Sequence, residues 1–236
     1  MNVRVEIQRL SRPNQTLVDR LEQAHGDREP CVRAFKDAYK RYRLCCERLL
    51  LEWSVLRRYG NGPYYVRKVG GAFTAAQKKV ARQFHAVAPF VEVDVFNAII
   101  HARILLDRTV GLSRFFLPRA AQRPSFSSFN EHRKFLNRRR VPGITDTAYA
   151  EFIRSETEWL VEVLKEFRDH GLVHAERAAW TALATGWHPN NDLILLYALH
   201  GRQPVPGRGE ITLPELLLNL RAFLERFNAL GVNMMR

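Results

Sequence analysis

The residues best suited to chemistry lie close together, in the segment Phe-Arg-Asp-His-Gly-Leu-Val-His at 167–174. Arg168 and Asp169 come at the end of a predicted amphipathic helix, and His174 follows after five intervening residues. A histidine can accept and return protons near neutral pH, and an arginine can bind a phosphate through two N–H groups. Asp169 could orient either side chain. A purely structural interpretation stays open, because a helix dipole favours arginine near a helix C-terminus and His174 can hydrogen-bond a loop carbonyl.

This arrangement resembles HEPN-domain proteins, a family of small helical bundles whose motif is an arginine, usually a polar residue, and then a histidine. Arg168, Asp169 and His174 fit that motif, within the phrase EFRDHGLVHAE. The apolar segment FNAIIHARILLDRTVGLSRFFL (96–117) is similar to a core helix of such bundles, and the likeness in architecture covers 30–175. The resemblance implies a metal-independent endoribonuclease with these three residues as catalytic groups, often completed across a homodimer. Other family members only bind partners or serve as inactive scaffolds.

Other catalytic signatures are missing from the sequence. It has no GxxxxGK[ST], GxGxxG, GxSxG or HExxH motif, and its eight histidines are scattered, so we expect no metal site and no cofactor. The three cysteines are Cys31, Cys45 and Cys46. They form no CxxC pair, and their odd number suits a reducing compartment.

The charge of the chain points to a polyanionic partner. Lysine and arginine total 37 against 24 acidic residues, which gives a net charge of +13. Such an excess favours nucleic acid, RNA in particular, over an anionic membrane surface, with a merely solvated basic surface as the alternative. The basic residues concentrate on a long predicted helix at 33–58 and in a second cluster predicted to bind nucleic acid, which comprises Arg133, Lys134, Arg138, Arg139 and Arg140.

The segment 91–117 is the most apolar predicted helix, with apolar side chains almost all round. Its narrow polar side comprises Asp94, Asn97, His101 and Arg108. Arg103, Asp107 and Arg114 fall inside the apolar arc instead. Because Arg103 and Asp107 are four residues apart they can pair, and Glu156, on the apolar stripe of the helix at 147–169, is a further candidate partner of Arg103. We interpret Arg103, Asp107 and Glu156 as buried polar support, either structural or for a site.

The remaining elements follow from periodicity and from turn residues. We expect a strand or extended arm at 3–9 and helices at 15–25, 30–59, 74–86, 127–139 and 147–169. Pro89 should separate the helix at 74–86 from the next, and turns are expected at 60–65, 69–71 and 141–146, the last followed by an Asp146 or Thr147 cap. A capping box at 212–215 opens a final helix that Gly231 should end.

The expected fold is a mainly α, up-and-down helical bundle with a small β-hairpin near 177–200, formed by runs at 176–186 and 192–201. The chain reads as a single helical domain over 1–236, with a possible hairpin-plus-helix extension at 176–236, and 202–210 as a loop. No apolar run is long enough for a signal peptide or a membrane span, so we expect a cytoplasmic protein with no membrane partner. A nucleic-acid-binding module without catalysis, or a helical subunit of a protein assembly, are the alternatives to a ribonuclease.

Overall fold

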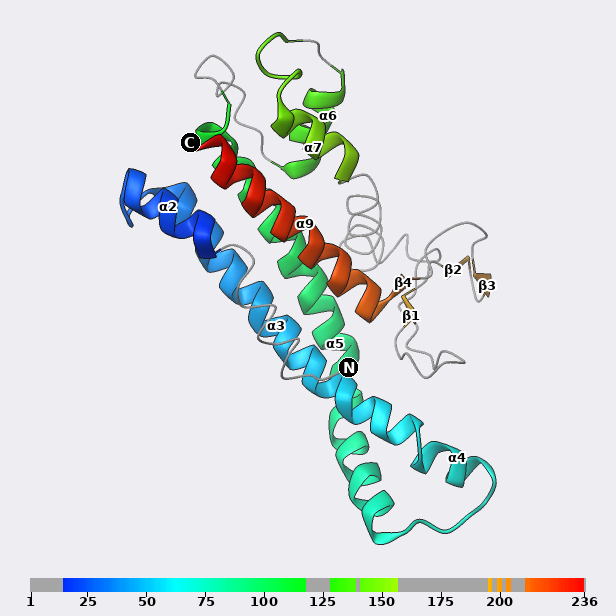
Figure 1. Ribbon diagram of the computed structural model, residues 1–236. Coiled ribbons are helices and arrows are strands. Elements are labelled where there is room, and N and C mark those ends of the chain that lie inside the picture. Colours follow the sequence, from blue (N-terminus) through cyan, green and yellow to red (C-terminus); the bar gives the residue numbers. More distant parts are fainter. Residues whose placement is uncertain are drawn as a thin grey trace. The chain divides into compact units, whose positions relative to one another are not determined.

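The computed structural model describes residues 15–117, 128–138, 141–156, 195–196, 199–200, 203–204 and 211–235. The described chain is mainly helical, which confirms the predicted fold class (Figure 1). None of its helices has an apolar stretch of the length that crossing a bilayer requires. The helices are α2 (Gln15–His25), α3 (Pro30–Gly60), α4 (Pro63–Lys68), α5 (Ala75–Leu112), a 3-10 turn η1 (Ser113–Phe115), α6 (Phe129–Arg138), α7 (Ala148–Glu156) and α9 (Leu213–Met234).

Pro89 does not separate two helices, contrary to the expectation from sequence. It lies inside the continuous helix α5, on the side exposed to solvent. A proline within a helix removes one backbone hydrogen bond, but on the exposed side water can satisfy the carbonyl that loses its donor. Val91 and Val95, just beyond it, are buried, so packing of the opposite side favours continuing the helix. The bounds predicted for α2 and α3 are correct to within one residue, whereas α4 occupies part of a segment expected to be a turn.

The chain divides into two compact units, and the divisions fall inside α3, α5 and α9. We call Ser11–Arg43, Ile100–Lys165 and Asn219–Arg236 the bundle unit. We call the other, which comprises Met1–Leu10, Leu44–Ile99 and Glu166–Leu218, the hairpin unit. Each unit is described separately below, for its described residues.

In the bundle unit, Phe227 of α9 joins elements that are far apart in sequence. Its ring is fully buried, and its centroid lies 6.2 Å from that of Phe35, 5.8 Å from Phe116, 6.4 Å from Phe152 and 6.0 Å from Phe223. These rings come from α3, the residue after η1, α7 and α9. Aromatic pairs add about 0.5–1.5 kcal/mol each beyond the area they bury, so this cluster is a main source of the unit's stability.

The sequence predicted that Gly231 would end the final helix. Instead, Gly231 lies within α9, which continues to Met234. A Cβ atom added at this position would come within 2.8 Å of Leu17 Cδ1 and 2.9 Å of Phe116 Cζ, closer than real side-chain carbons approach. The lack of a side chain therefore lets α9 pack closely against α2 and against Phe116, the residue after η1. Glycine has a packing role here that its helix-breaking tendency does not reveal.

We expect Gly231→Ala to destabilise the protein by about 1–2 kcal/mol, because overpacking outweighs the gain in helix propensity. Urea unfolding followed by circular dichroism measures the difference. Ala229→Gly is the control: this position of the same helix is exposed, so the change measures helix propensity alone and should cost about 1 kcal/mol. A Gly231→Ala variant as stable as the wild type would contradict the close packing.

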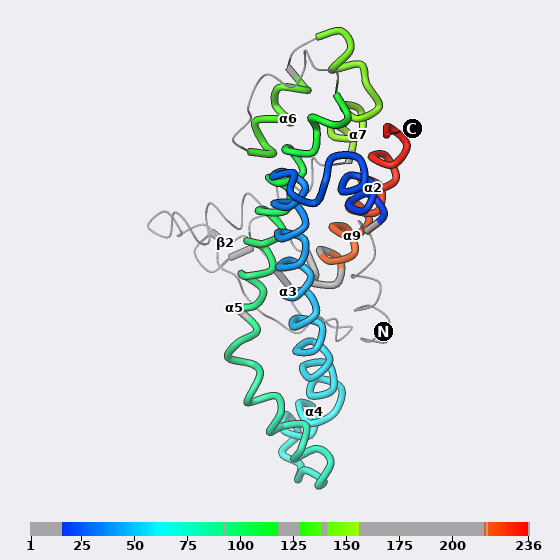
Figure 2. The backbone as a smooth tube through the Cα atoms, turned by 90° about the vertical axis from the view of Figure 1, so that its left-hand side faces the viewer, coloured from blue at the N-terminus to red at the C-terminus, as the bar shows by residue number. Residues whose placement is uncertain are grey.

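In the hairpin unit, the last part of α3 and the first part of α5 lie side by side, with α4 between them in the chain (Figures 1 and 2). The rings of Tyr59 and Phe84 stack with their centroids 3.9 Å apart and fix the two helices near the turn. Thr74 and Gln77 form a reciprocal capping box: Gln77 N donates to Thr74 Oγ1 at 3.3 Å and Thr74 N to Gln77 Oε1 at 2.9 Å. This box fixes where α5 begins.

Four two-residue strands are described near the C-terminal helix. β1 (Leu195–Leu196) pairs antiparallel with β4 (Ile211–Thr212), and β2 (Leu199–His200) pairs antiparallel with β3 (Gln203–Pro204). The partners of the run at 192–201 therefore lie downstream of it, and β3 occupies part of a segment predicted as a loop. The run at 176–186, which was predicted to be the other half of the hairpin, lies outside the described residues, as does the arm at 3–9.

Candidate nucleic-acid interface

Arg168, Asp169 and His174, the predicted catalytic residues, lie outside the described residues. Arg139 and Arg140 of the predicted nucleic-acid-binding cluster do so as well. Of the rest of that cluster, Lys134 is exposed and Arg133 half-buried on α6, and Arg138 is the last residue of this helix. Glu131 of α6 is also exposed, so the basic residues of this helix have a carboxylate nearby in the sequence.

The longest stretch without a carboxylate lies elsewhere, in residues 53–91 of the hairpin unit, which we call the basic hairpin. It contains seven basic residues and no aspartate or glutamate, so it supplies +7 of the net +13. They are Arg57, Arg58, Arg67, Lys68, Lys78, Lys79 and Arg82. All are exposed except Arg57, which is half-buried with its guanidinium 5.6 Å from the centroid of Trp53. The sequence interpretation included Arg57 and Arg58 but missed the other five, which a search for stretches without carboxylates would have found.

The basic residues of the bundle unit differ from these because carboxylates neutralise several of them. Lys36 Nζ lies 2.7 Å from Glu22 Oε1, and the hydrogen bond between them raises the pKa of Lys36. Arg114 Nη1 lies 3.0 Å from Glu29 Oε1. Arg114 was predicted inside the apolar arc, but η1 carries it away from the helix axis and 53% of its side chain is exposed.

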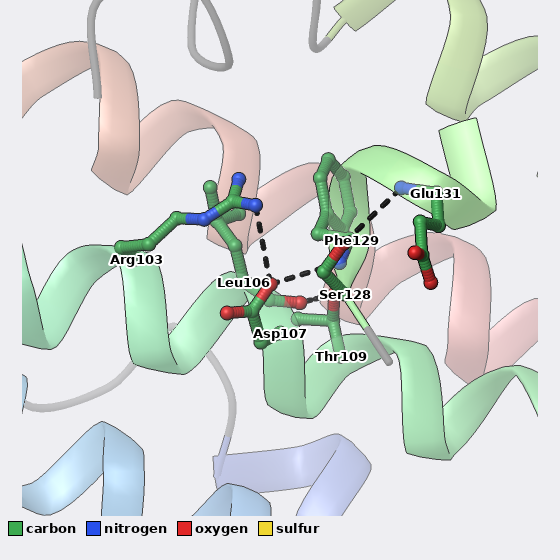
Figure 3. Close-up of polar contacts among 7 residues, drawn as sticks. All are labelled: Arg103, Leu106, Asp107, Thr109, Ser128, Phe129 and Glu131. Carbon is green, nitrogen blue, oxygen red and sulfur yellow. Dashed lines mark hydrogen bonds and ion pairs between the residues drawn. The ribbon is translucent and has the colours of Figure 1, made fainter. Parts of the chain in front are cut away.

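Arg103 and Asp107 occupy the positions predicted for buried polar support, and they contact each other. Arg103 is 4% exposed, and its Nη2 lies 3.5 Å from Asp107 Oδ1 (Figure 3). The same oxygen accepts a hydrogen bond from the backbone N–H of Phe129 at 2.8 Å, so Asp107 caps the first turn of α6 from another helix. The pair thus fixes α6 against α5. The side chain of Glu156, the other predicted partner of Arg103, lies outside the described part of the chain.

We expect Asp107→Ala to destabilise the protein by about 2 kcal/mol, since both the charge facing Arg103 and the acceptor for Phe129 N–H are lost. Asp107→Asn keeps an acceptor oxygen without the charge and should cost about half as much. Urea unfolding of both variants provides the comparison. Equal losses for alanine and asparagine would show that the hydrogen bond to Phe129 contributes nothing.

A buried carboxyl pair lies at the base of the basic hairpin, and it includes Asp94, which the sequence had placed on the narrow polar side of its helix. Asp94 is only 4% exposed and Glu52 only 7%. Arg48 Nε lies 2.6 Å from Asp94 Oδ2 and 3.4 Å from Glu52 Oε1. Burial, with the hydrogen bond and the negative charge of Asp94, raises the pKa of Glu52 to about 8, although Arg48 opposes the shift. The raised pKa favours a protonated Glu52 beside the carboxylate of Asp94 at neutral pH.

Cys45 lies close enough to this pair for its thiol to be affected. Burial and the negative charge of Asp94 raise the pKa of Cys45. A raised pKa keeps the sulfur protonated, and a thiol is a poor nucleophile and a poor metal ligand. The described residues contain no grouping of three histidine, cysteine, aspartate or glutamate side chains that could bind a metal. The pair is thus better suited to holding a proton than to metal or nucleophilic chemistry.

A second buried polar pair lies in the bundle unit, between α6 and α7. His132 and Tyr149 are both fully buried, and His132 Nε2 lies 3.1 Å from Tyr149 Oη. Burial lowers the pKa of His132 to about 4 and raises that of Tyr149. Thr147, one of the two predicted caps, accepts a hydrogen bond from Ala150 N at 3.2 Å and so begins α7. With no charged group as a cause of either shift, we interpret this pair as structural.

Comparison with known proteins found no matching family model, no matching curated protein and no matching solved structure. The function is therefore inferred from the residues of this chain alone. Among the described residues, the basic hairpin is the feature that departs furthest from an ordinary protein surface.

Proposed function

We propose that this chain binds nucleic acid and that the basic hairpin is the contact surface. The observation that carries the proposal is the uninterrupted positive charge of 53–91, where seven basic residues occur without one carboxylate. Phosphate backbones bind such surfaces by releasing condensed counterions, without regard to sequence. The charge is available to a ligand because six of the seven residues are exposed.

Ion pairing within the described part of the chain does not compete with a phosphate at this surface. None of the seven basic residues has a carboxylate at ion-pairing distance among the residues that the structure describes. In the bundle unit, by contrast, Lys36 and Arg114 are already paired. A phosphate at the basic hairpin therefore gains attraction without first displacing a carboxylate of the described residues. RNA is the nucleic acid that the resemblance to HEPN-domain proteins favours.

A binding assay over a salt series tests the proposal. A fluorescent 20-nucleotide RNA is titrated with the full chain, and anisotropy gives the affinity at each salt concentration. We compare Lys78, Lys79 and Arg82 replaced by glutamine with a control in which Arg33, Lys40 and Arg41, exposed residues of the bundle unit, are replaced in the same way. Both variants lose three charges, so net charge alone would affect them equally.

The hairpin variant should bind at least tenfold more weakly than the wild type at about 0.1 M salt. Its slope of log affinity against log salt should fall by about 2, since each lost phosphate contact on a single strand removes about 0.7. The control should lose less than about threefold. Equal losses in the two variants, or no binding by the wild type, would refute the hairpin as the contact surface.

Cleavage of RNA by Arg168, Asp169 and His174 stays a prediction, as does their completion across a homodimer. A metal-independent ribonuclease should degrade a mixed RNA pool in the presence of EDTA, and His174→Ala should abolish that activity. Light scattering during gel filtration gives the oligomeric state of the same samples. If His174→Ala degrades RNA as fast as the wild type, the ribonuclease hypothesis fails while binding by the basic hairpin remains open.

A further inference from the structure

We infer that Tyr64 and Tyr65 form a stacking surface for unpaired bases, so that the basic hairpin binds single-stranded in preference to double-stranded nucleic acid. This inference rests on the proposed function and names its ligand class more narrowly. Both tyrosines lie on α4, within the basic hairpin.

The geometry of α4 presents the two rings together. Pro63 is buried and occupies the first position of this helix, where proline is favoured, and so holds it against the rest of the hairpin unit. The centroids of the two tyrosine rings are 5.5 Å apart with their planes at 76°. Tyr65 is 47% exposed, and Tyr64 is half-buried. The exposed part of Tyr65 gives a flat ligand aromatic surface to contact.

Positive charge and an exposed loop follow these rings directly in the sequence. Arg67 and Lys68, in the last turn of α4, are both exposed. The following residues, Val69, Gly70 and Gly71, are exposed as well, and Gly70 has a φ of 72°, a conformation that glycine adopts readily. Figure 1 shows α4 and this loop at the turn between α3 and α5. A strand can thus place its phosphates on the basic side chains while a base contacts a tyrosine.

Basic residues together with exposed tyrosines can distinguish single-stranded from double-stranded nucleic acid, for a simple reason. In a duplex, base faces are stacked inside the helix, so an external ring cannot reach them. In a single strand each base has an accessible face, and stacking on an aromatic side chain adds about 1–3 kcal/mol per base. Basic residues alone would favour the duplex, which has the higher charge density. The tyrosines are therefore the feature that would reverse the preference.

The test compares an unstructured 20-nucleotide RNA with the duplex it forms with its complement, at the same salt concentration. The full-length variants are Tyr65→Leu, which keeps the apolar bulk and removes the ring face, and Tyr65→Phe, which keeps the face. Vesicles of phosphatidylcholine with phosphatidylserine form a third arm, because exposed Tyr65 and Val69 beside basic residues could instead enter an anionic membrane.

We expect Tyr65→Leu to bind the single strand about tenfold more weakly and the duplex less than twofold more weakly, with Tyr65→Phe close to the wild type for both. Equal losses for both ligands, or a duplex bound more tightly than the single strand by the wild type, would overturn the inference and leave the proposed function standing. Binding to vesicles but to neither RNA would overturn both. Circular dichroism of each variant confirms that α4 and the helices beside it are folded.

Discussion

The stability difference between the wild type and Glu52→Gln should grow by about 4 kcal/mol as the pH rises from 4.5 to 8, with the variant the more stable. In the folded protein the pKa of Glu52 is raised to about 8, from an ordinary value of 4.5 in the unfolded chain. The stabilisation from its protonated carboxyl is complete below pH 4.5 and is lost as the pH rises toward 8. Glutamine does not ionise, so the stability of the variant does not fall in this way as the pH rises.

Buried surroundings explain why the effect is large. Asp94, which shares the site and accepts the Glu52 proton's hydrogen bond, is 4% exposed, so ionising both carboxyls places two negative charges out of water with only Arg48 to offset them. Glutamine can still donate a hydrogen bond to Asp94 through its amide. At pH 4.5 and below, the variant and the wild type should therefore differ by less than about 1 kcal/mol.

Urea unfolding at intervals between pH 4 and pH 8.5 measures this difference directly. Glu47→Gln is the matched control, because Glu47 lies on the same helix but is only half-buried. Its difference from the wild type should vary by less than about 0.5 kcal/mol over the same range. A difference for Glu52→Gln that is independent of pH would show that Glu52 is ionised throughout and that no proton is held between the two carboxyls.

Acid should destabilise the protein through His132, and this is the second large effect. Burial lowers the pKa of His132 to about 4 in the folded protein, against 6.5 when it is exposed. The neutral ring's contribution is therefore fully present above pH 6.5 and is lost as the pH falls toward 4. At one unit of pKa per 1.36 kcal/mol, the loss amounts to about 2–3 kcal/mol at pH 4.

Two variants show whether burial or the contact with Tyr149 lowers the pKa of His132. His132→Gln should be less stable than the wild type at pH 7, because packing is lost. This difference in the free energy of unfolding should be smaller by about 2–3 kcal/mol at pH 4, because only the wild type loses stability when His132 is protonated. Tyr149→Phe removes the hydroxyl 3.1 Å from the ring but keeps the histidine buried, so its stability should fall with acid as the wild type's does. The imidazole proton signals in NMR spectra give the pKa directly. A pKa near 6.5 for His132 would contradict the prediction.

The wider pattern is that local features of this chain were visible in the sequence. The bounds of α2 and α3, the turn at 141–146 and the capping role of Thr147 all follow from periodicity, turn residues and short-range hydrogen bonding. These are interactions between residues a few positions apart, and the chain alone specifies them. The i,i+4 contact of Arg103 with Asp107 belongs to the same class.

Errors arose where a residue's local tendency and its packing disagree. Pro89 and Gly231 both disfavour a helix locally, yet both lie inside helices because the neighbouring faces are packed. Asp94 has the polarity of a surface residue but is buried beside Arg48 and Glu52, which come from a helix more than 40 positions earlier in the chain. Such partners cannot be identified from spacing, because the chain's path through space decides which residues meet.

The sequence by itself determined that this protein is mainly helical and strongly basic, since helical periodicity and net charge depend only on the order and types of residues. The sequence also shows that 53–91 has no carboxylate, but only the structure shows that the basic side chains of this segment are exposed together. Only the tertiary structure decided that this segment is a helical hairpin with its basic side chains exposed, that Glu52 and Asp94 share a buried site, and that Asp107 caps a distant helix. Exposure, burial and contacts between distant residues are properties of packing, and packing is settled only when the whole chain has folded.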